Sequence, residues 1–168
     1  RARDWARRIP TRAGSVAEAL RPEAGYDVAL CLYGVGQVRP AIEGFAALTA
    51  AWPESSYARQ GALHAAGIAG DDFARRRDDA DAGRLYRQTL EILLEQYGDD
   101  PAIAPYWYDL GYLRFIQGDY AAASRAYGRT PPRDGRFIEA GYLRVGCLFR
   151  LAEGGERAGC ERAIEAAQ

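Results

Sequence analysis

Residues 104–130 read APYWYDLGYLRFIQGDYAAASRAYGRT, and this stretch decides the fold class. Its first half places residues of a packing stripe at the spacings of an amphipathic helix, namely Trp107, Leu110, Gly111 and Phe115. Gly118-Asp119 breaks that helix, and the second half returns to helical spacing at Tyr120, Ala123, Ala126 and Tyr127. Thr130-Pro131-Pro132 stops the second helix, because proline cannot continue one. The stretch predicts two short helices joined by a tight turn, a helical hairpin.

The pattern returns elsewhere in the chain. After a step of 35 residues it recurs at Tyr142, Val145, Gly146 and Phe149, followed by a turn at Glu153-Gly154-Gly155 and a helix with Ala158, Ala163 and Ile164. Upstream, a first helix carries Val28, Ala29 and Leu32, Gly36-Gln37 forms the turn, and a second helix carries Ala41, Ile42, Phe45 and Leu48 before Pro53. The first residues predict two further helices, at 2–9 and 15–20.

A middle unit is less regular. We expect it to start at Tyr57, Gly61 and His64 and to place its second helix at 79–97. It is about 15 residues longer than its neighbours, and the excess includes the charged link GDDFARRRDDAD at 70–81. The link alternates acidic pairs with three arginines, so it is interpreted as a solvated loop or frayed helix end whose charges compensate each other.

Small residues recur at equivalent places in these helices. A glycine inside a helix costs about 1 kcal/mol relative to alanine, so Gly61, Gly111 and Gly146 imply close packing against the second helix of the same hairpin. Alanines on the second helices suit the same contact, at Ala41, Ala82, Ala123 and Ala158. One hairpin cannot bury its apolar face alone, so the units must stack, with large residues such as Trp107 and Tyr142 filling the space between hairpins.

Composition narrows the classes of function. The 168 residues carry 22 basic and 23 acidic side chains, and this balance gives no electrostatic footprint for nucleic acid or an anionic membrane. All the basic residues are arginine, which indicates a coding bias. No apolar run approaches the roughly 18 residues of a membrane span. The chain starts at Arg1 and contains no methionine, so we expect a fragment or a processed form.

Candidate chemistry is sparse, and no cofactor is predicted. His64 is the only histidine and is expected to be a packed or partly exposed repeat residue. The aspartates at 71–81 lack the alternating pattern of a calcium loop, and arginines compete for them. Cys147 should lie on the groove side of its helix and Cys160 should point elsewhere, which disfavours a disulfide between them. Gly34-x-Gly36 lacks the third glycine of a dinucleotide fingerprint.

These residues resemble the tetratricopeptide repeat family. Its consensus is matched in 104–130 at Trp107, Leu110, Gly111, Gly118, Tyr120, Ala123 and Tyr127, with departures at Arg114 and Thr130. WPESSYA at 52–58 resembles a junction frequent in bacterial envelope proteins of this family. The resemblance implies an all-α, right-handed α-solenoid of stacked antiparallel hairpins over 22–168. The expected repeats are 22–55, 56–100, 101–134 and 135–168, and 1–21 is an N-terminal helical segment or partial repeat.

The resemblance also implies where a partner would bind. First helices of this family line a concave groove, into which Tyr108, Asp109, Tyr112, Phe115, Leu143, Arg144, Cys147 and Arg150 would project. Tyrosines beside arginines are typical of contact hot spots. The family's two-carboxylate clamp needs lysine and asparagine, and this chain has neither.

The expected function is therefore a non-catalytic scaffold that binds a peptide or partner domain in this groove, without nucleic acid and without direct membrane insertion. The alternative is a structural or assembly segment of a larger envelope protein or multidomain enzyme. A third interpretation, an enzyme using His64 with carboxylates of the link, requires His64 and two of them in one pocket. Oligomerisation through an end repeat stays open, and so does the compartment, bacterial cytoplasm or cell envelope.

Overall fold

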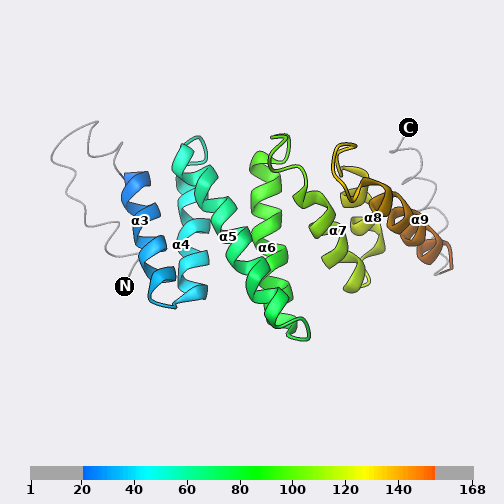
Figure 1. The fold of residues 1–168 in the computed structure, drawn as a ribbon, viewed down its shortest axis with the longest axis horizontal. Coiled ribbons are helices and arrows are strands. Elements are labelled where there is room, and N and C mark those ends of the chain that lie inside the picture. The colour runs from blue at the N-terminus through cyan, green and yellow to red at the C-terminus, as the bar shows by residue number, and fades with distance from the viewer. Residues whose placement is uncertain (1–20, 154–168) are drawn as a thin grey trace. The chain divides into compact units, whose positions relative to one another are not determined.

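The computed structural model describes residues 21–153, and the predicted all-α class is confirmed there. Seven helices follow one another in this part of the chain (Figure 1): α3 (Arg21–Gly34), α4 (Val38–Ala51), α5 (Ser56–Arg75), α6 (Ala80–Tyr97), α7 (Tyr106–Ile116), α8 (Tyr120–Gly128) and α9 (Phe137–Glu153). None of these seven is both long enough and apolar enough to cross a membrane.

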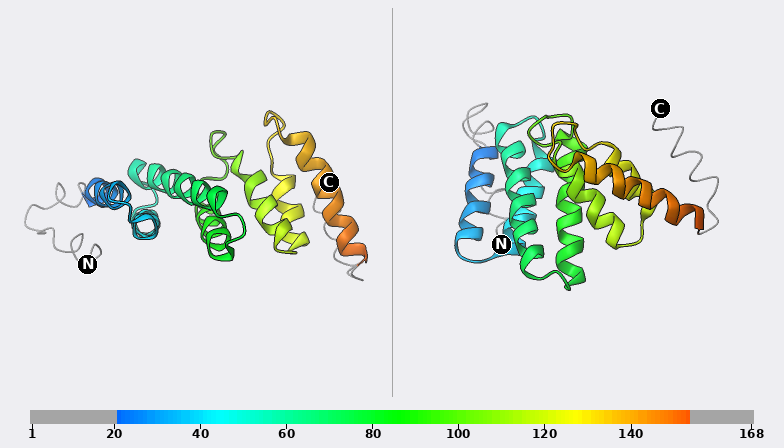
Figure 2. Two further views of the ribbon diagram at one scale, coloured as in Figure 1. Left: turned by 60° about the horizontal axis from the view of Figure 1, so that its bottom comes forward. Right: turned by 45° about the vertical axis from the view of Figure 1, so that its right-hand side comes forward.

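Helices that follow each other in the chain pack together in two compact units. The first unit ends at Gln96 and holds α3, α4, α5 and nearly all of α6, and the second begins at Tyr97 and holds α7, α8 and α9. In the first, α4 contacts both α3 and α5, and in the second α8 contacts both α7 and α9, as the views of Figure 2 show. The expected ranges 22–55, 56–100 and 101–134 each hold two of these helices.

The two tight turns predicted at glycines are present. Gly36, between α3 and α4, has φ +78°, and Gly118, between α7 and α8, has φ +79°. Both values lie in the left-handed region that glycine reaches without steric cost. Asp119 then caps α8, because its carboxylate accepts a hydrogen bond from the Ala122 amide at 3.0 Å. These local signals fix the ends of α7 and α8 in the chain.

A close contact between the two helices of a hairpin recurs at a spacing of 16 residues. A Cβ built on Gly70 of α5 would lie 3.1 Å from the Tyr86 ring of α6. A Cβ built on Gly111 of α7 would lie 2.6 Å from the Tyr127 ring of α8. In both hairpins a bare glycine backbone therefore lets a tyrosine of the second helix approach closely.

This contact corrects the predicted register of the middle unit. Gly61 was expected to meet α6, but a Cβ there would lie 3.0 Å from Phe45 and 3.3 Å from Leu48, both on α4 of the preceding hairpin. Gly70 and not Gly61 is thus the equivalent of Gly111. The 20-residue α5 begins 14 residues before Gly70, whereas the 11-residue α7 begins five residues before Gly111. The extra turns of α5 pack against α4.

The charged link is mostly helical. Helix α5 continues to Arg75 and α6 begins at Ala80, so only four residues of the expected loop lie outside helices. Arg76 pairs with Asp72 on one side and with Asp79 on the other. Asp79 also accepts hydrogen bonds from the backbone amides that open α6, at 2.8 Å from Asp81. The predicted mutual compensation of charge is present, within helix ends.

Each unit has its own core. The core of the first unit centres on buried residues of α3, α4 and α5, including Tyr26, Ala29, Ile42, Phe45, Leu48, Ala58 and Ala65. Ala29 and Phe45 are both fully buried there and are again 16 residues apart. The core of the second unit is smaller, with Ala123, Tyr127, Ala140 and Cys147 at its centre. Trp107 lies at its edge, where its ring nitrogen donates to the Gly98 carbonyl and Arg129 stacks on its face at 3.9 Å.

One face of α9 differs from the expected packing. Tyr142 was expected to fill space between hairpins, but 76% of its surface is exposed, and Val145 and Phe149 are exposed too. A Cβ on Gly146 would meet no described atom within 4 Å, so the close contact predicted there is absent among residues 21–153. The second helix predicted after α9, and the two helices predicted before residue 21, lie outside the described residues.

Candidate functional site

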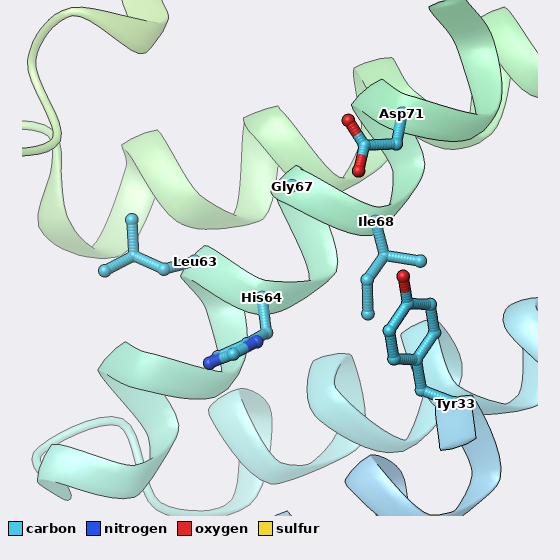
Figure 3. Close-up of a pocket in the computed structure, with 6 residues that line it drawn as sticks. All are labelled: Tyr33, Leu63, His64, Gly67, Ile68 and Asp71. Carbon is cyan, nitrogen blue, oxygen red and sulfur yellow. The ribbon is translucent and has the colours of Figure 1, made fainter. Parts of the chain in front are cut away.

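A solvent-open hollow of about 390 Å³ lies in the first unit, on the face shared by the first helices α3 and α5. Figure 3 shows it in close-up, with the side chains that line it, Tyr33 from α3 and Leu63, His64, Gly67, Ile68 and Asp71 from α5. His64, Gly67 and Asp71 are spaced by three and four residues, so they follow one face of α5. The sequence did not predict a site in this place.

The hollow exists because a side chain is missing at Gly67. The two hairpin contacts place Gly70 opposite Gly111 in the repeat, a shift of 41 residues, and the same shift places Gly67 opposite Tyr108. Where α7 carries a tyrosine ring, α5 carries only a hydrogen. A Cβ on Gly67 would meet no described atom within 4 Å, so this position opens to solvent. The face that the family resemblance assigns to a partner is thus hollowed in the first unit.

The polar groups of the hollow are held in different ways. The His64 ring stacks on Phe45, with centroids 5.8 Å apart, and meets Tyr26 edge-on at 5.7 Å. Its side chain is still exposed on the outer side. Asp71 is exposed and makes no hydrogen bond or ion pair with any described residue. The core therefore orients the imidazole, while the carboxylate is available to a ligand.

The arrangement lacks the geometry of an acid–base pair. His64 and Asp71 are seven residues apart on one helix, about 10 Å along its axis at 1.5 Å per residue. Asp71 is the only carboxylate that lines the hollow. Asp72 and Asp79 are paired with Arg76, and no group of three metal-ligating side chains occurs among residues 21–153. The two carboxylates beside His64 that the enzyme interpretation requires are not found in this part of the chain.

In the second unit, Arg136 holds two of the predicted groove residues. Its guanidinium donates to the Asp109 carboxylate at 2.8 Å and to the Pro105 carbonyl at 3.1 Å, and it lies over the Tyr108 ring at 4.5 Å. Burial and a hydrogen bond with Glu139 raise the pKa of Tyr108 to about 12. Tyr108 and Asp109 thus fasten the start of α9 to α7.

The other predicted groove residues are scattered. Phe115 and Leu143 are half-buried and pack against the core of the second unit, Phe115 beside the Tyr120 ring at 5.6 Å. Tyr112 is 37% exposed and is the one large aromatic of the predicted set that stays at the surface. Arg144 lies against Gly128 at the carboxyl end of α8, where a cation is favourable, and the exposed Arg150 contacts Glu153 at 3.6 Å.

The expected position of Cys147 is wrong. It was expected on the groove side of α9, but it is fully buried among Ala123, Tyr127 and Ala140. Burial raises the pKa of its thiol to about 11, so it is inert towards nucleophilic chemistry at neutral pH. It is a free thiol, and Cys160, its candidate partner, lies outside the described residues. The helix turns its small apolar side chain inward because α8 offers alanine there.

Asp134, just before α9, gives a testable pH dependence. Hydrogen bonds from Arg136 hold the pKa of this mostly buried carboxyl below its ordinary value near 4. Its stabilising contribution is therefore complete above the unfolded-state pKa and is lost as the pH falls through the folded-state pKa. We expect Asp134→Asn to lower the free energy of unfolding by about 1–2 kcal/mol at pH 7. Urea unfolding from pH 7 to pH 3 should show the gap from the wild type closing on acidification, and a constant gap would contradict this.

Comparison of the chain with protein-family models, with curated proteins and with solved structures found no significant match in any of the three. The class that the described residues define is therefore an all-α protein of sequentially packed helices with a hollowed first-helix face. The likeness to tetratricopeptide repeats rests on the residues and on the 16-residue contact alone.

Proposed function

We propose that the protein is a non-catalytic scaffold of the tetratricopeptide type, which binds a peptide or a partner domain along the faces of its first helices. In this proposal the hairpins stack as a right-handed solenoid. The observation that carries it is the hollow between α3 and α5, on the face where repeats of this type bind partners. Its lining offers aromatic, apolar and charged groups without a nucleophile–base pair, a composition suited to recognition.

The second unit supports the proposal through Tyr112. This tyrosine lies one turn beyond Tyr108 on the same helix face, and it stays exposed while Tyr108 is held by Arg136. Exposed tyrosines contribute large, rigid contact area, and a few such residues dominate the affinity of most interfaces. Tyr112 is therefore the residue of α7 that we expect to touch the partner.

The test starts from the whole chain, immobilised to capture proteins that are then identified and purified. We expect Tyr112→Ala to weaken the binding of the purified partner at least about tenfold by calorimetry, as for a hot-spot residue. The matched control is Arg125→Ala, because Arg125 is exposed on the second helix α8. Tyr33→Ala is the corresponding variant in the first unit. If the partner binds both tyrosine variants as tightly as the wild type, the proposal is wrong.

A further inference from the structure

Gly67 has no packing role within the described residues. Glycine in the middle of a helix lowers stability relative to alanine, so its presence calls for a reason. Gly61, Gly70 and Gly111 have one, because a Cβ at each would press within 3.1 Å of a neighbouring aromatic ring. A Cβ at Gly67 would meet nothing within 4 Å of it. The bare backbone at Gly67 is therefore explained by what approaches from solvent.

The lining of the hollow indicates the chemistry of that ligand. Ile68 and Leu63 supply apolar surface, and Tyr33, 42% exposed, presents its ring from α3 (Figure 3). Asp71, one turn beyond Gly67, is an exposed carboxylate without a partner among the described residues. A long apolar stem that ends in a cation fits this combination, since arginine and lysine bury their stems and keep the charged end at a polar group. A tyrosine ring adds a favourable cation–π contact.

The charge around the hollow favours the same ligand. Residues 21–96 carry eleven acidic and eight basic side chains, and no basic side chain lines the hollow. Burial, together with the neighbouring carboxylates Glu23 and Asp27 of α3, raises the pKa of Tyr57, which shows that carboxylates act on the α3–α5 side of this unit. An anionic ligand would meet Asp71 with like charge, and a purely apolar one would desolvate it without compensation.

We propose that the hollow over Gly67 receives an arginine or lysine side chain of the bound peptide, with the cation at Asp71 and the stem along Ile68. This assignment rests on the proposed function, since it names the chemistry of the partner for the same face. Gly67 sets the depth of the hollow, and Asp71 sets the sign of the charge it accepts. Charge-assisted hydrogen bonds from a guanidinium to a carboxylate supply the specificity.

His64 makes the proposal measurable, because it is the only histidine of the chain and lines the hollow. Its imidazole proton resonances report on this one place by NMR. The probe is N-acetyl-arginine-N-methylamide, and its neutral isostere N-acetyl-citrulline-N-methylamide is the control ligand. At constant pH we expect saturable shifts with the arginine probe and a Kd of about 1–10 mM, ordinary for a ligand of this size. The citrulline probe should bind at least about fivefold more weakly.

Two variants locate the binding. Asp71→Asn should abolish the preference for the arginine probe over the citrulline probe, since the carboxylate is lost while the shape is kept. Gly67→Leu should abolish binding of both probes, because the new side chain occupies the hollow, and circular dichroism checks that the helices remain. The absence of a His64 shift at about 50 mM arginine probe, several times the expected Kd, would overturn the proposal. So would equal binding of the two probes to the wild type, or an unchanged preference in Asp71→Asn.

The outcomes separate this assignment from the proposed function. If the arginine probe fails while capture of a partner still depends on Tyr33 and Tyr112, the charge assignment is wrong and the scaffold proposal stands. If the probe binds as expected while no partner depends on those tyrosines, the hollow is a cation site and the scaffold proposal falls.

Discussion

Replacing Gly111 with alanine is expected to lower the free energy of unfolding by about 2 kcal/mol, although alanine is the better helix former. The new Cβ would lie 2.6 Å from one Tyr127 ring carbon and 2.7 Å from another. The ring cannot move aside easily, because Tyr127 is 2% exposed and meets the Tyr108 ring edge-on at 5.7 Å. Overpacking of such a site typically costs 1–3 kcal/mol, and separation of α7 from α8 is the alternative.

Two other glycines provide the matched controls. Gly70→Ala should be milder than Gly111→Ala, because its Cβ would lie 3.1 Å from Tyr86, whose ring is only half-buried. Gly67→Ala should raise the free energy of unfolding by about 0.5–1 kcal/mol, since the methyl group enters open space and helix propensity improves. Urea unfolding followed by circular dichroism measures all three. Gly111→Ala as stable as Gly67→Ala would show that the hairpin contact does not limit the approach of the helices.

The hairpin of α7 and α8 could be predicted from sequence because its signals are local. The stripe through Trp107 and Leu110, the turn at Gly118 and the stop before Pro131 each act within a few residues. Physical rules at that range do not depend on the rest of the chain. The structure accordingly confirms both helices, with their ends shifted by one or two residues.

The register of α5 was missed because its decisive residues are small. In the places of Trp107 and Leu110, α5 carries Ala66 and Ala69, which give no strong periodic signal. The aromatic Tyr57 lies nearer the start of α5 and attracted the alignment instead. The 16-residue interval from Gly70 to Tyr86, matched with that from Gly111 to Tyr127, would have found the true register.

The candidate site was misplaced for a related reason. Sequence patterns draw attention to side chains, and the aromatic cluster around Tyr108 is rich in them. Its tyrosine and Asp109 are instead held by Arg136, a residue 27 positions beyond Asp109 whose approach no local pattern reveals. The hollow depends on an absent side chain, at Gly67, and becomes visible only when helices are compared in the correct register.

Phe45→Ala is expected to have the largest effect on stability, about 3–5 kcal/mol of unfolding free energy. The Phe45 ring is fully buried, its centroid is 5.6 Å from that of Tyr26, and it fills the space left by Gly61. Alanine would leave a cavity between α3, α4 and α5 that backbone relaxation cannot close. The first unit depends on this ring because its other core residues are largely alanines, at Ala29, Ala58, Ala62, Ala65, Ala66 and Ala69.

A conservative variant separates stability from the site. Phe45→Leu keeps most of the buried volume, so we expect a loss of about 1–1.5 kcal/mol and intact helices by circular dichroism. It still removes the aromatic ring that stacks on His64 at an interplanar angle of 24°. The His64 imidazole resonances should therefore move in Phe45→Leu even without ligand, whereas Tyr33→Ala should leave stability within about 0.5 kcal/mol. A loss below about 1.5 kcal/mol for Phe45→Ala would show that α3 and α5 are held to α4 by other contacts. Unmoved His64 resonances in Phe45→Leu would show that the core does not orient the imidazole.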